Sequence, residues 1–404
     1  YSFTLKDGTG IAAIWCIDND VENGRAMAPK ITTKFNQPVE FYDMMGNRRT
    51  ADTDNRGYTG IQLSPMPLFI KAKDVKSLTS SLRSVTSDDV KSNLKVSIQP
   101  SVDGGINANI KNLTGRSQRG VIEVSNSKVE YSLAPEKENK LTIPGQAVKV
   151  QYGKMYRWDH QYKVKPAKGK AMTDEWKMDF FYVPRTSGMP DWSKIPSIPI
   201  NNYYPKDKKR GPNDQNASFK IAWDTHNLYL RVDAQDDRFI KFPDEWSKSG
   251  SDTRLYMHDG CLEVYFDTGA DGRSNLTKGY DNNDYRYDFS IGNNGKSGPG
   301  MVYRLREVNH QLADGVNMPT KKEAAEKVKC DFRITGTGYV YTIVFGQRYI
   351  EPLTLKKGFI SGFGLFLHDK DQNPAKGWKG LSLATEEGSH CDHKPHVWPL
   401  MILK

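Results

Sequence analysis

The stretch NASFKIAWDTHNLYLRVDAQDDRF (residues 216–239) contains two runs in which every second residue is apolar, separated by a short polar segment. The alternating apolar residues are Phe219, Ile221, Trp223, Leu228, Leu230 and Val232. Because successive side chains of a strand point to opposite faces, each run predicts a strand with one apolar face. The letters DTHN between them are typical of a turn, so the stretch predicts a β-hairpin. The acids that follow, Asp233, Asp236 and Asp237, either solvate a loop or help to hold a ligand.

The whole chain has the composition of turn-rich β structure. It has 404 residues, 37% of them hydrophobic, with 34 Gly, 21 Pro and 20 Tyr, and this length suggests two to four domains. Two short segments, 74–85 and 321–329, are compatible with helices. We therefore predict an all-β protein of three consecutive β-sandwich-type domains.

The positive charge of the chain does not point to a nucleic-acid partner. The formal net charge is +10, yet Lys and Arg are dispersed along the sequence. The densest cluster, KDKKR (206–210), lies between Pro and Gly, which indicates a solvated loop rather than a nucleic-acid site. No apolar run approaches the roughly 18 residues that a membrane helix needs, so we expect no membrane span.

The start of the chain and its cysteines leave questions open. The chain begins with Tyr1, without an initiator Met or a signal peptide, and we expect a processed or excised segment of an extracellular or cell-surface protein. Cys16, Cys261, Cys330 and Cys391 lie far apart without paired-ligand spacing. Sequence alone does not decide whether they form disulfides.

Three blocks separate by pattern. Block 1–88 contains strand-like segments but too few to close a sandwich, so we expect its missing strands upstream or in another chain. Block 89–187 contains short alternating segments at regular spacing, which predicts an immunoglobulin-like sandwich acting as a spacer. Within it, NLTGRSQRGVIEV (112–124) is typical of a hairpin. Block 188–404 opens with GMPDWSKIPSIPI (188–200) and predicts another all-β sandwich.

The third block resembles the family 9 carbohydrate-binding modules, which belong to the DOMON-like sandwiches. The resemblance lies in the order of five stretches: DW (191–192), FKIAWDTHNLYLRVDAQDD (219–237), HDGCLEVYFD (258–267), DNNDYRYDF (281–289) and GFGLFLHDKD (362–371). It implies a two-sheet sandwich that binds sugars, often with calcium ions that tighten loops.

The first block resembles the β-rich tail that follows the catalytic barrel of clan A glycosidases. The matching stretches are LKDGTGIAAIW (5–15), YDMMGN (42–47) and LSPMPLFIKA (63–72). The two resemblances together imply a non-catalytic, C-terminal part of a larger glycoside hydrolase, with a polysaccharide or oligosaccharide as partner. Glycoside hydrolysis needs two carboxylates held by a scaffold, and no alternation of strands and helices predicts a barrel here, so we expect no active site in this chain.

The resemblance implies three sugar-binding residues. Family 9 modules carry an aromatic residue three positions before the Asp that is here Asp259, which makes Tyr256 the expected aromatic platform. They also carry an arginine in the strand matching DYRYDF, here Arg286. A guanidinium offers a planar fork of donors to adjacent hydroxyls, and Glu263 can accept from the same sugar. The alternative is that Arg286 and Glu263 form a structural ion pair across strands.

Two positions depart from the family pattern. The loop TEEGSHCDHKPHVW (385–398) has no clear counterpart of the second aromatic platform, and Phe366 replaces an amide-bearing residue. Trp246 and Trp378 are candidates for the missing platform. Alternatively, these tryptophans plug the end of the sandwich.

Two groups of residues have the chemistry of metal ligands. Asp267, Asp271, Asp281 and Asp284 cluster around one pair of expected loops and could supply oxygens to a structural calcium ion, although Asp is common in turns without metal. The stretch HCDHKPH offers a second, zinc- or copper-type set, whose spacing fits no zinc finger: His390, Cys391, His393 and His396.

Two other function classes remain open at this point. Related DOMON-like sandwiches bind haem for electron transfer, and Met257, His258 and His368 are possible axial ligands, although Met257 can equally be a core residue. The chain can also be a cell-surface structural protein whose sandwiches serve assembly.

Overall fold

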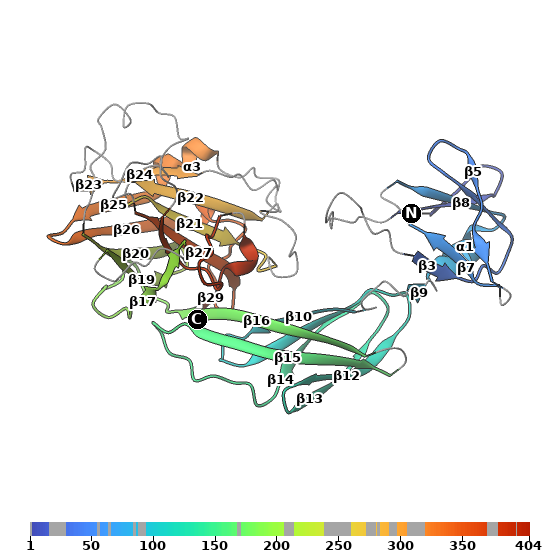
Figure 1. Ribbon diagram of the computed structural model, residues 1–404, viewed down its shortest axis with the longest axis horizontal. Helices are drawn as coiled ribbons and strands as arrows, with labels where there is room; N and C mark the ends of the chain where they lie inside the picture. The colour runs from blue at the N-terminus through green and yellow to red at the C-terminus, as the bar shows by residue number, and fades with distance from the viewer. Residues whose placement is uncertain are drawn as a thin grey trace. The chain divides into compact units, whose positions relative to one another are not determined.

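The computed structural model describes residues 2–15, 30–54, 57–63, 66–83, 86–87, 94–167, 171–205, 214–237, 260–271, 280, 283–290, 297–304, 320–369, 379–392 and 394–404. The described elements are almost all strands, so the all-β prediction is confirmed (Figure 1). The chain divides into two compact units. Unit 1 contains residues 1–99, 107–144 and 161–174, and unit 2 contains residues 100–106, 145–160 and 175–404.

The first part of unit 1 has two small sheets around a short helix. One sheet has the strand order β1 (Ser2–Thr4), β2 (Gly10–Ile14), β8 (Leu68–Ala72), β4 (Val39–Tyr42) and β5 (Arg48–Arg49). The other has the order β6 (Asp52–Thr53), β7 (Thr59–Gln62), β3 (Lys30–Thr33) and β9 (Thr86–Ser87). Helix α1 (Val75–Arg83) confirms the first predicted helix, and its Leu78 is fully buried beside Ile70. The helix therefore covers the apolar side chains that the short strands leave exposed.

The middle of the chain contains strands β10 (Leu94–Pro100), β11 (Ile106–Asn112), β12 (Gln118–Val124), β13 (Ser127–Leu133), β14 (Glu138–Ile143), β15 (Tyr156–Pro166) and β16 (Met172–Val183). The predicted hairpin at 112–124 is wrong. β11 lies between β10 and β14, whereas β12 pairs with β13 and β15. The side chain of Asn112 donates to the carbonyls of Arg116 (2.7 Å) and Ala134 (2.9 Å), which turns the chain into the other sheet after β11.

Unit 2 contains a sandwich of two sheets. The first sheet has the order β17 (Ile198–Ile200), β19 (Gln215–Trp223), β20 (Asn227–Asp236), β26 (Gly338–Gly346), β25 (Lys329–Ile334) and β23 (Gly298–Pro299). The second has the order β16, β29 (Leu400–Leu403), β27 (Ile360–His368), β21 (Leu262–Asp267), β22 (Asp284–Ser290) and β24 (Met301–Arg304). β28 (Gly380–Ser382) pairs with both β27 and β18 (Asn202–Tyr204). Among the described residues of unit 2, the remaining elements are the predicted helix α3 (Lys321–Lys327) and two 3-10 turns, η3 (Gln347–Tyr349) and η5 (Pro395–Val397).

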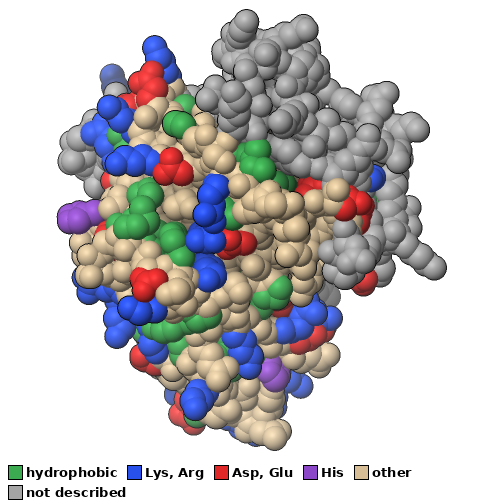
Figure 2. Space-filling view, turned by 90° about the vertical axis from the view of Figure 1, so that its left-hand side faces the viewer, with side chains coloured by type: hydrophobic (Ala, Val, Ile, Leu, Met, Phe, Trp, Pro, Cys, Tyr) green, Lys and Arg blue, Asp and Glu red, His purple; other side chains and the backbone are tan. Residues whose placement is uncertain are grey.

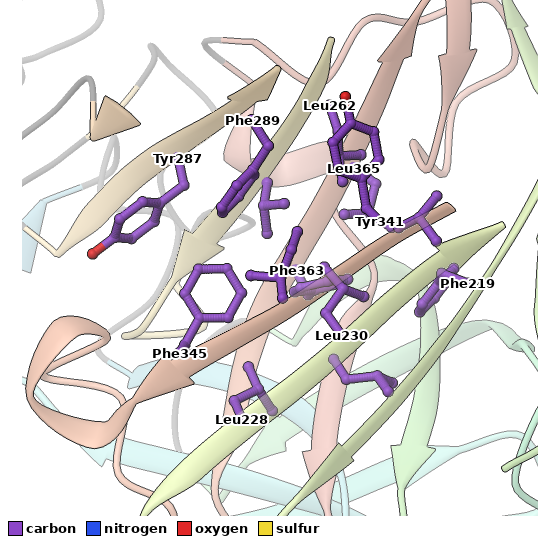
Figure 3. Packing of buried hydrophobic residues seen from close by; sticks show 14 of the residues in the cluster. Phe219, Leu228, Leu230, Leu262, Tyr287, Phe289, Tyr341, Phe345, Phe363 and Leu365 are labelled. Carbon is purple, nitrogen blue, oxygen red and sulfur yellow. The ribbon is translucent and has the colours of Figure 1, made fainter. Parts of the chain in front are cut away.

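The core of unit 2 lies between these two sheets (Figure 3). The hairpin of β19 and β20 is confirmed, and Trp223 pairs with Leu228 at its turn. All six alternating apolar residues of this hairpin are buried in the core. They meet aromatic side chains of the second sheet, among them Phe289 and Phe363. Burial of large aromatic side chains supplies most of the stabilisation of such a sandwich.

The surface gives no sign of a single charged patch on the face drawn in Figure 2. There, Lys and Arg side chains lie close to Asp and Glu side chains, among small apolar patches. In the described part of the chain, no helix has the length and apolarity required to cross a membrane.

Candidate functional site

The second sheet of unit 2 has a polar face opposite its core face. On β21, Leu262, Val264 and Phe266 point into the core, and on β22 the residues of the core face are Tyr285, Tyr287 and Phe289. Strand alternation therefore places the intervening residues on the other face. These residues are paired directly across the two strands as Glu263 with Asp288, Tyr265 with Arg286, and Asp267 with Asp284.

β27 continues this polar face on the other side of β21. Its Phe366 lies opposite Glu263 and its Gly364 opposite Tyr265, and His368 follows on the same face. A Cβ atom on Gly364 would lie only 3.0 Å from the indole of Trp398. The glycine thus leaves room for an aromatic side chain to cover the face.

Arg286 is the centre of a buried ion-pair cluster. Its Nε donates to Oδ1 of Asp288 at 2.7 Å and its Nη2 donates to Oδ2 at 2.9 Å, which is a bidentate pair. Nη2 also lies 3.3 Å from Oε1 of Glu263, and Nη1 lies 3.3 Å from Oδ1 of Asp392. The side chain of Arg286 is only 3% exposed, and those of Glu263 and Asp288 no more than 1%. One guanidinium therefore pairs with two fully buried carboxylates and with a third, that of Asp392, which is 19% exposed.

Glu263 links this cluster to two histidines. Its Oε1 lies 3.0 Å from Nε2 of His368, and its Oε2 lies 3.9 Å from Nε2 of His390. The hydroxyl of Tyr265 donates a short hydrogen bond to Oε2. The carboxylate thus has His368 and Arg286 beside Oε1, and Tyr265 and His390 beside Oε2.

The segment between β28 and β29 covers the polar face. Its Cys391 and Trp398 are fully buried and form a small apolar cluster with Tyr265 and Phe366. The ring of His390 lies on the ring of Phe366, with centroids 3.8 Å apart. The indole of Trp398 donates to the carbonyl of Cys391 at 2.9 Å within the segment, and the thiol of Cys391 donates to the carbonyl of Leu365 on β27 at 3.3 Å, which fixes the segment on the sheet.

Burial shifts the pKa values of the titratable groups in the site. It raises the pKa of Asp288 to about 7, against the opposing effect of Arg286. It lowers the pKa of His390 to about 4 and raises the pKa of Cys391 to about 12. Burial, with Glu263 nearby, also raises the pKa of Tyr265 well above its ordinary value. At neutral pH His390 is therefore a neutral imidazole and Cys391 a protonated thiol.

The structure brings together two of the five expected sugar-binding residues. Glu263 and Arg286 lie on neighbouring strands and make the ion pair that the sequence offered as an alternative, with a distance of 3.3 Å. Their role in sugar binding stays a prediction. Tyr256, Trp246 and Trp378 lie outside the described residues.

The expected calcium ligands are partly described. Asp267 and Asp284 lie directly opposite each other on β21 and β22, and both are buried. The backbone N–H of Asp271 donates to Oδ1 of Asp267 at 3.3 Å. Asp281 lies outside the described residues. Of the acids after the opening hairpin, Asp233 is bound by Arg231 through both carboxylate oxygens.

The described residues of the HCDHKPH stretch make different contacts. The thiol of Cys391 donates to the carbonyl of Leu365 at 3.3 Å, whereas His390 lies near Glu263. His396 lies in η5, and His393 lies outside the described residues. For the haem alternative, His368 is fully buried beside Glu263, and Met257 and His258 lie outside the described residues.

Sequence reasoning missed Asp288, Tyr265 and Asp392 as members of the site. A signal for the first was present, because Arg and Asp two residues apart on a strand share a face and can pair. Tyr265 has the same spacing from Glu263. Asp392 carried no such signal, because it reaches Arg286 from a segment 106 positions later in the sequence.

The comparison with protein families gives one match, to the carbohydrate family 9 binding domain-like family, over residues 188–404. This range is more than half of the chain and contains the whole polar face. The chain belongs to this family. The predicted family 9 module at the C-terminus is thereby confirmed, and its two-sheet architecture is that of the sandwich in unit 2.

Solved family 9 modules are similar to this chain at low identity. One from Caldicellulosiruptor kristjanssonii in complex with cellotriose has 16% identity and a TM-score of 0.38, and covers 55% of this chain and 92% of its own. The same module with glucose has 16% identity and a TM-score of 0.38, and covers 55% and 95%. These values are too low to assign individual residues by superposition. A search of curated proteins gave no match.

Proposed function

We propose that this chain is a non-catalytic carbohydrate-binding and scaffolding region of a larger secreted glycoside hydrolase, and that its family 9 module binds the sugar. Membership of a carbohydrate-binding family supports the binding role. The proposal about the larger enzyme rests on the resemblance of residues 1–88 to a glycosidase tail. The extracellular location follows from this proposal, since enzymes of that kind act on polysaccharides outside the cell.

The observation that carries the binding proposal is the match of residues 188–404 to the family, and we place the site at Arg286 and Glu263, which lie 3.3 Å apart on the polar face. Sugar hydroxyls both donate and accept hydrogen bonds, so a guanidinium beside a carboxylate can bind two adjacent hydroxyls. Asp288 holds two N–H groups of Arg286 and so fixes the orientation of its plane. We expect Tyr256, Trp246 or Trp378 to supply the flat apolar face for the sugar ring.

Calorimetric titration of the full chain with glucose, cellotriose and a panel of other oligosaccharides tests this proposal. We expect at least one sugar to bind, and Arg286→Lys to weaken its binding about 10- to 100-fold, the effect of losing a charge-assisted hydrogen bond. Arg231→Lys is the matched control, because Arg231 makes the same kind of pair with Asp233 on the other sheet. No heat with any glycan, or equal effects of both variants, would refute the proposed site.

A structural calcium ion near Asp267 and Asp284 is also part of the proposal. Two buried carboxylates directly opposite each other repel, and a cation coordinated by their oxygens removes the repulsion. Asp271 and Asp281 are the further ligands that we propose. We expect chelation to lower the melting temperature of the full chain and added Ca²⁺ to restore it, and an unchanged melting temperature would contradict the idea.

A further inference from the structure

Glu263, His368 and His390 form a group of which the proposed sugar site uses only Glu263 and the calcium proposal uses none. They come from β21, from β27 and from the segment before β29, and one ligand-type atom of each lies within 4.8 Å of the others. All three residues are buried. We infer that this group is a binding site for one divalent transition-metal ion that prefers nitrogen and oxygen ligands, of the zinc class.

The distances are close to those of a metal site. Ligand atoms about 2.0–2.2 Å from a tetrahedral ion lie roughly 3.3–3.5 Å from one another. Nε2 of His368 is 3.0 Å from Oε1 of Glu263, and Nε2 of His390 is 3.9 Å from Oε2. These distances run to different oxygens of Glu263, and the three ligand atoms lie within 4.8 Å of one another, so side-chain movements of about 1 Å would bring them to tetrahedral spacing. Two imidazoles and one carboxylate favour zinc over calcium, which prefers oxygen ligands alone.

The charges around the group also favour a cation. Among the described residues, the carboxylates of Glu263, Asp288 and Asp392 face the single guanidinium of Arg286. Three carboxylates thus share one guanidinium on this face, and a divalent ion bound at Glu263 would add positive charge beside them.

The residues around Glu263, His368 and His390 include hydrogen-bond donors of the kind that usually orient the ligands of a metal ion. Tyr265 and Arg286 bind the carboxylate of Glu263, and hydrogen bonds of this kind usually fix a ligating carboxylate. The ring of Phe366 lies between the two imidazoles, with centroids 4.8 Å from His368 and 3.8 Å from His390. The carboxylate of Glu263 is therefore oriented before an ion arrives.

One hydrogen bond has to change when the ion binds. Nδ1 of His390 accepts from the backbone N–H of Asp392 at 2.9 Å, so the neutral ring carries its proton on Nε2, the atom that faces Glu263. Binding through Nε2 moves the proton to Nδ1 and breaks the bond to Asp392. The tautomer of His390 consequently reports whether the ion is bound through this ring.

The test uses the full chain without a histidine tag, stripped with EDTA and titrated calorimetrically with ZnCl₂. We expect one equivalent to bind, with a rise in melting temperature because only the folded state offers the site. ¹⁵N chemical shifts of the His390 ring should change from the Nε2–H to the Nδ1–H tautomer. Binding to variants His390→Ala and Glu263→Gln should be weaker by at least about 100-fold.

His226→Ala is the control, because His226 lies in the exposed turn between β19 and β20. It should retain binding and the increase in melting temperature. If zinc does not bind, or binds equally to His390→Ala and Glu263→Gln, the inference is wrong. If His390→Ala fails to fold, Glu263→Gln and the His390 tautomer still decide. Sugar titrations of the metal-free chain test the proposed function separately, so either proposal can fail without the other.

Discussion

Two arginine–aspartate pairs with the same spacing lie on the two sheets of unit 2. Arg231 and Asp233 on β20 form a bidentate pair with contacts of 2.6–3.0 Å, as Arg286 and Asp288 do on β22 at 2.7–2.9 Å. The first pair is 25% and 33% exposed, whereas the second is 3% and 1% exposed. Local spacing thus produces the pair in both places, and only burial distinguishes a surface ion pair from the centre of a site.

The largest difference should appear when each arginine is removed. Arg286→Ala leaves the carboxylates of Glu263 and Asp288 buried without their cation, and we expect a loss of about 3–5 kcal/mol in stability. Arg231→Ala removes a partly exposed pair and should cost less than about 1 kcal/mol. Calorimetric melting of the full chain compares them. If the two variants lower the melting temperature by similar amounts, burial does not determine how much these ion pairs contribute to stability.

Measuring stability as a function of pH compares the aspartates of the two pairs, Asp288 and Asp233. Because burial raises the pKa of Asp288 to about 7, the folded state binds its proton more tightly than the unfolded state does. Its contribution to stability is therefore present below the ordinary pKa of Asp and is lost as the pH rises from about 4 to about 7. The loss is about 1.4 kcal/mol for each unit of pKa shift.

Variants at the two aspartates measure this effect. Asp288→Asn should flatten the dependence of the melting temperature on pH in that window, and Asp233→Asn, in the exposed pair, should retain the profile of the original chain. If Asp288→Asn leaves the dependence of the melting temperature on pH unchanged, a titratable group other than Asp288 causes that dependence.

The sequence was sufficient to predict the elements of the fold but not all of their partners. Alternation of apolar residues located β19 and β20, and the two predicted helices exist as α1 and α3. The partner of β12 could not be predicted in this way. Alternation shows which face of a strand is buried, whereas the loop after Asn112, closed by its amide, decides which sheet the strand joins.

The same limit applies to the candidate site. Glu263 and Arg286 were predicted from a resemblance, and alternation alone already places them on polar faces of their strands. The convergence of His368 and His390 on Glu263 depends on β27 lying beside β21 and on the segment that covers them. These residues are separated by more than twenty positions in the sequence, so no local spacing reveals that they meet.

The smallest expected effect concerns two tyrosines that donate to carboxylates. Tyr265 donates to the buried Glu263, whereas Tyr229 donates to Asp224 at 2.7 Å near a turn. Tyr265→Phe leaves a buried carboxylate with one donor fewer, which should cost about 1–3 kcal/mol, and Tyr229→Phe should cost less than about 1 kcal/mol because water replaces the hydroxyl at the turn. Thermal melts of both variants measure the difference. If Tyr265→Phe costs nothing, Arg286 and His368 satisfy the carboxylate without it, and the oxygen that faced Tyr265 is open to another ligand.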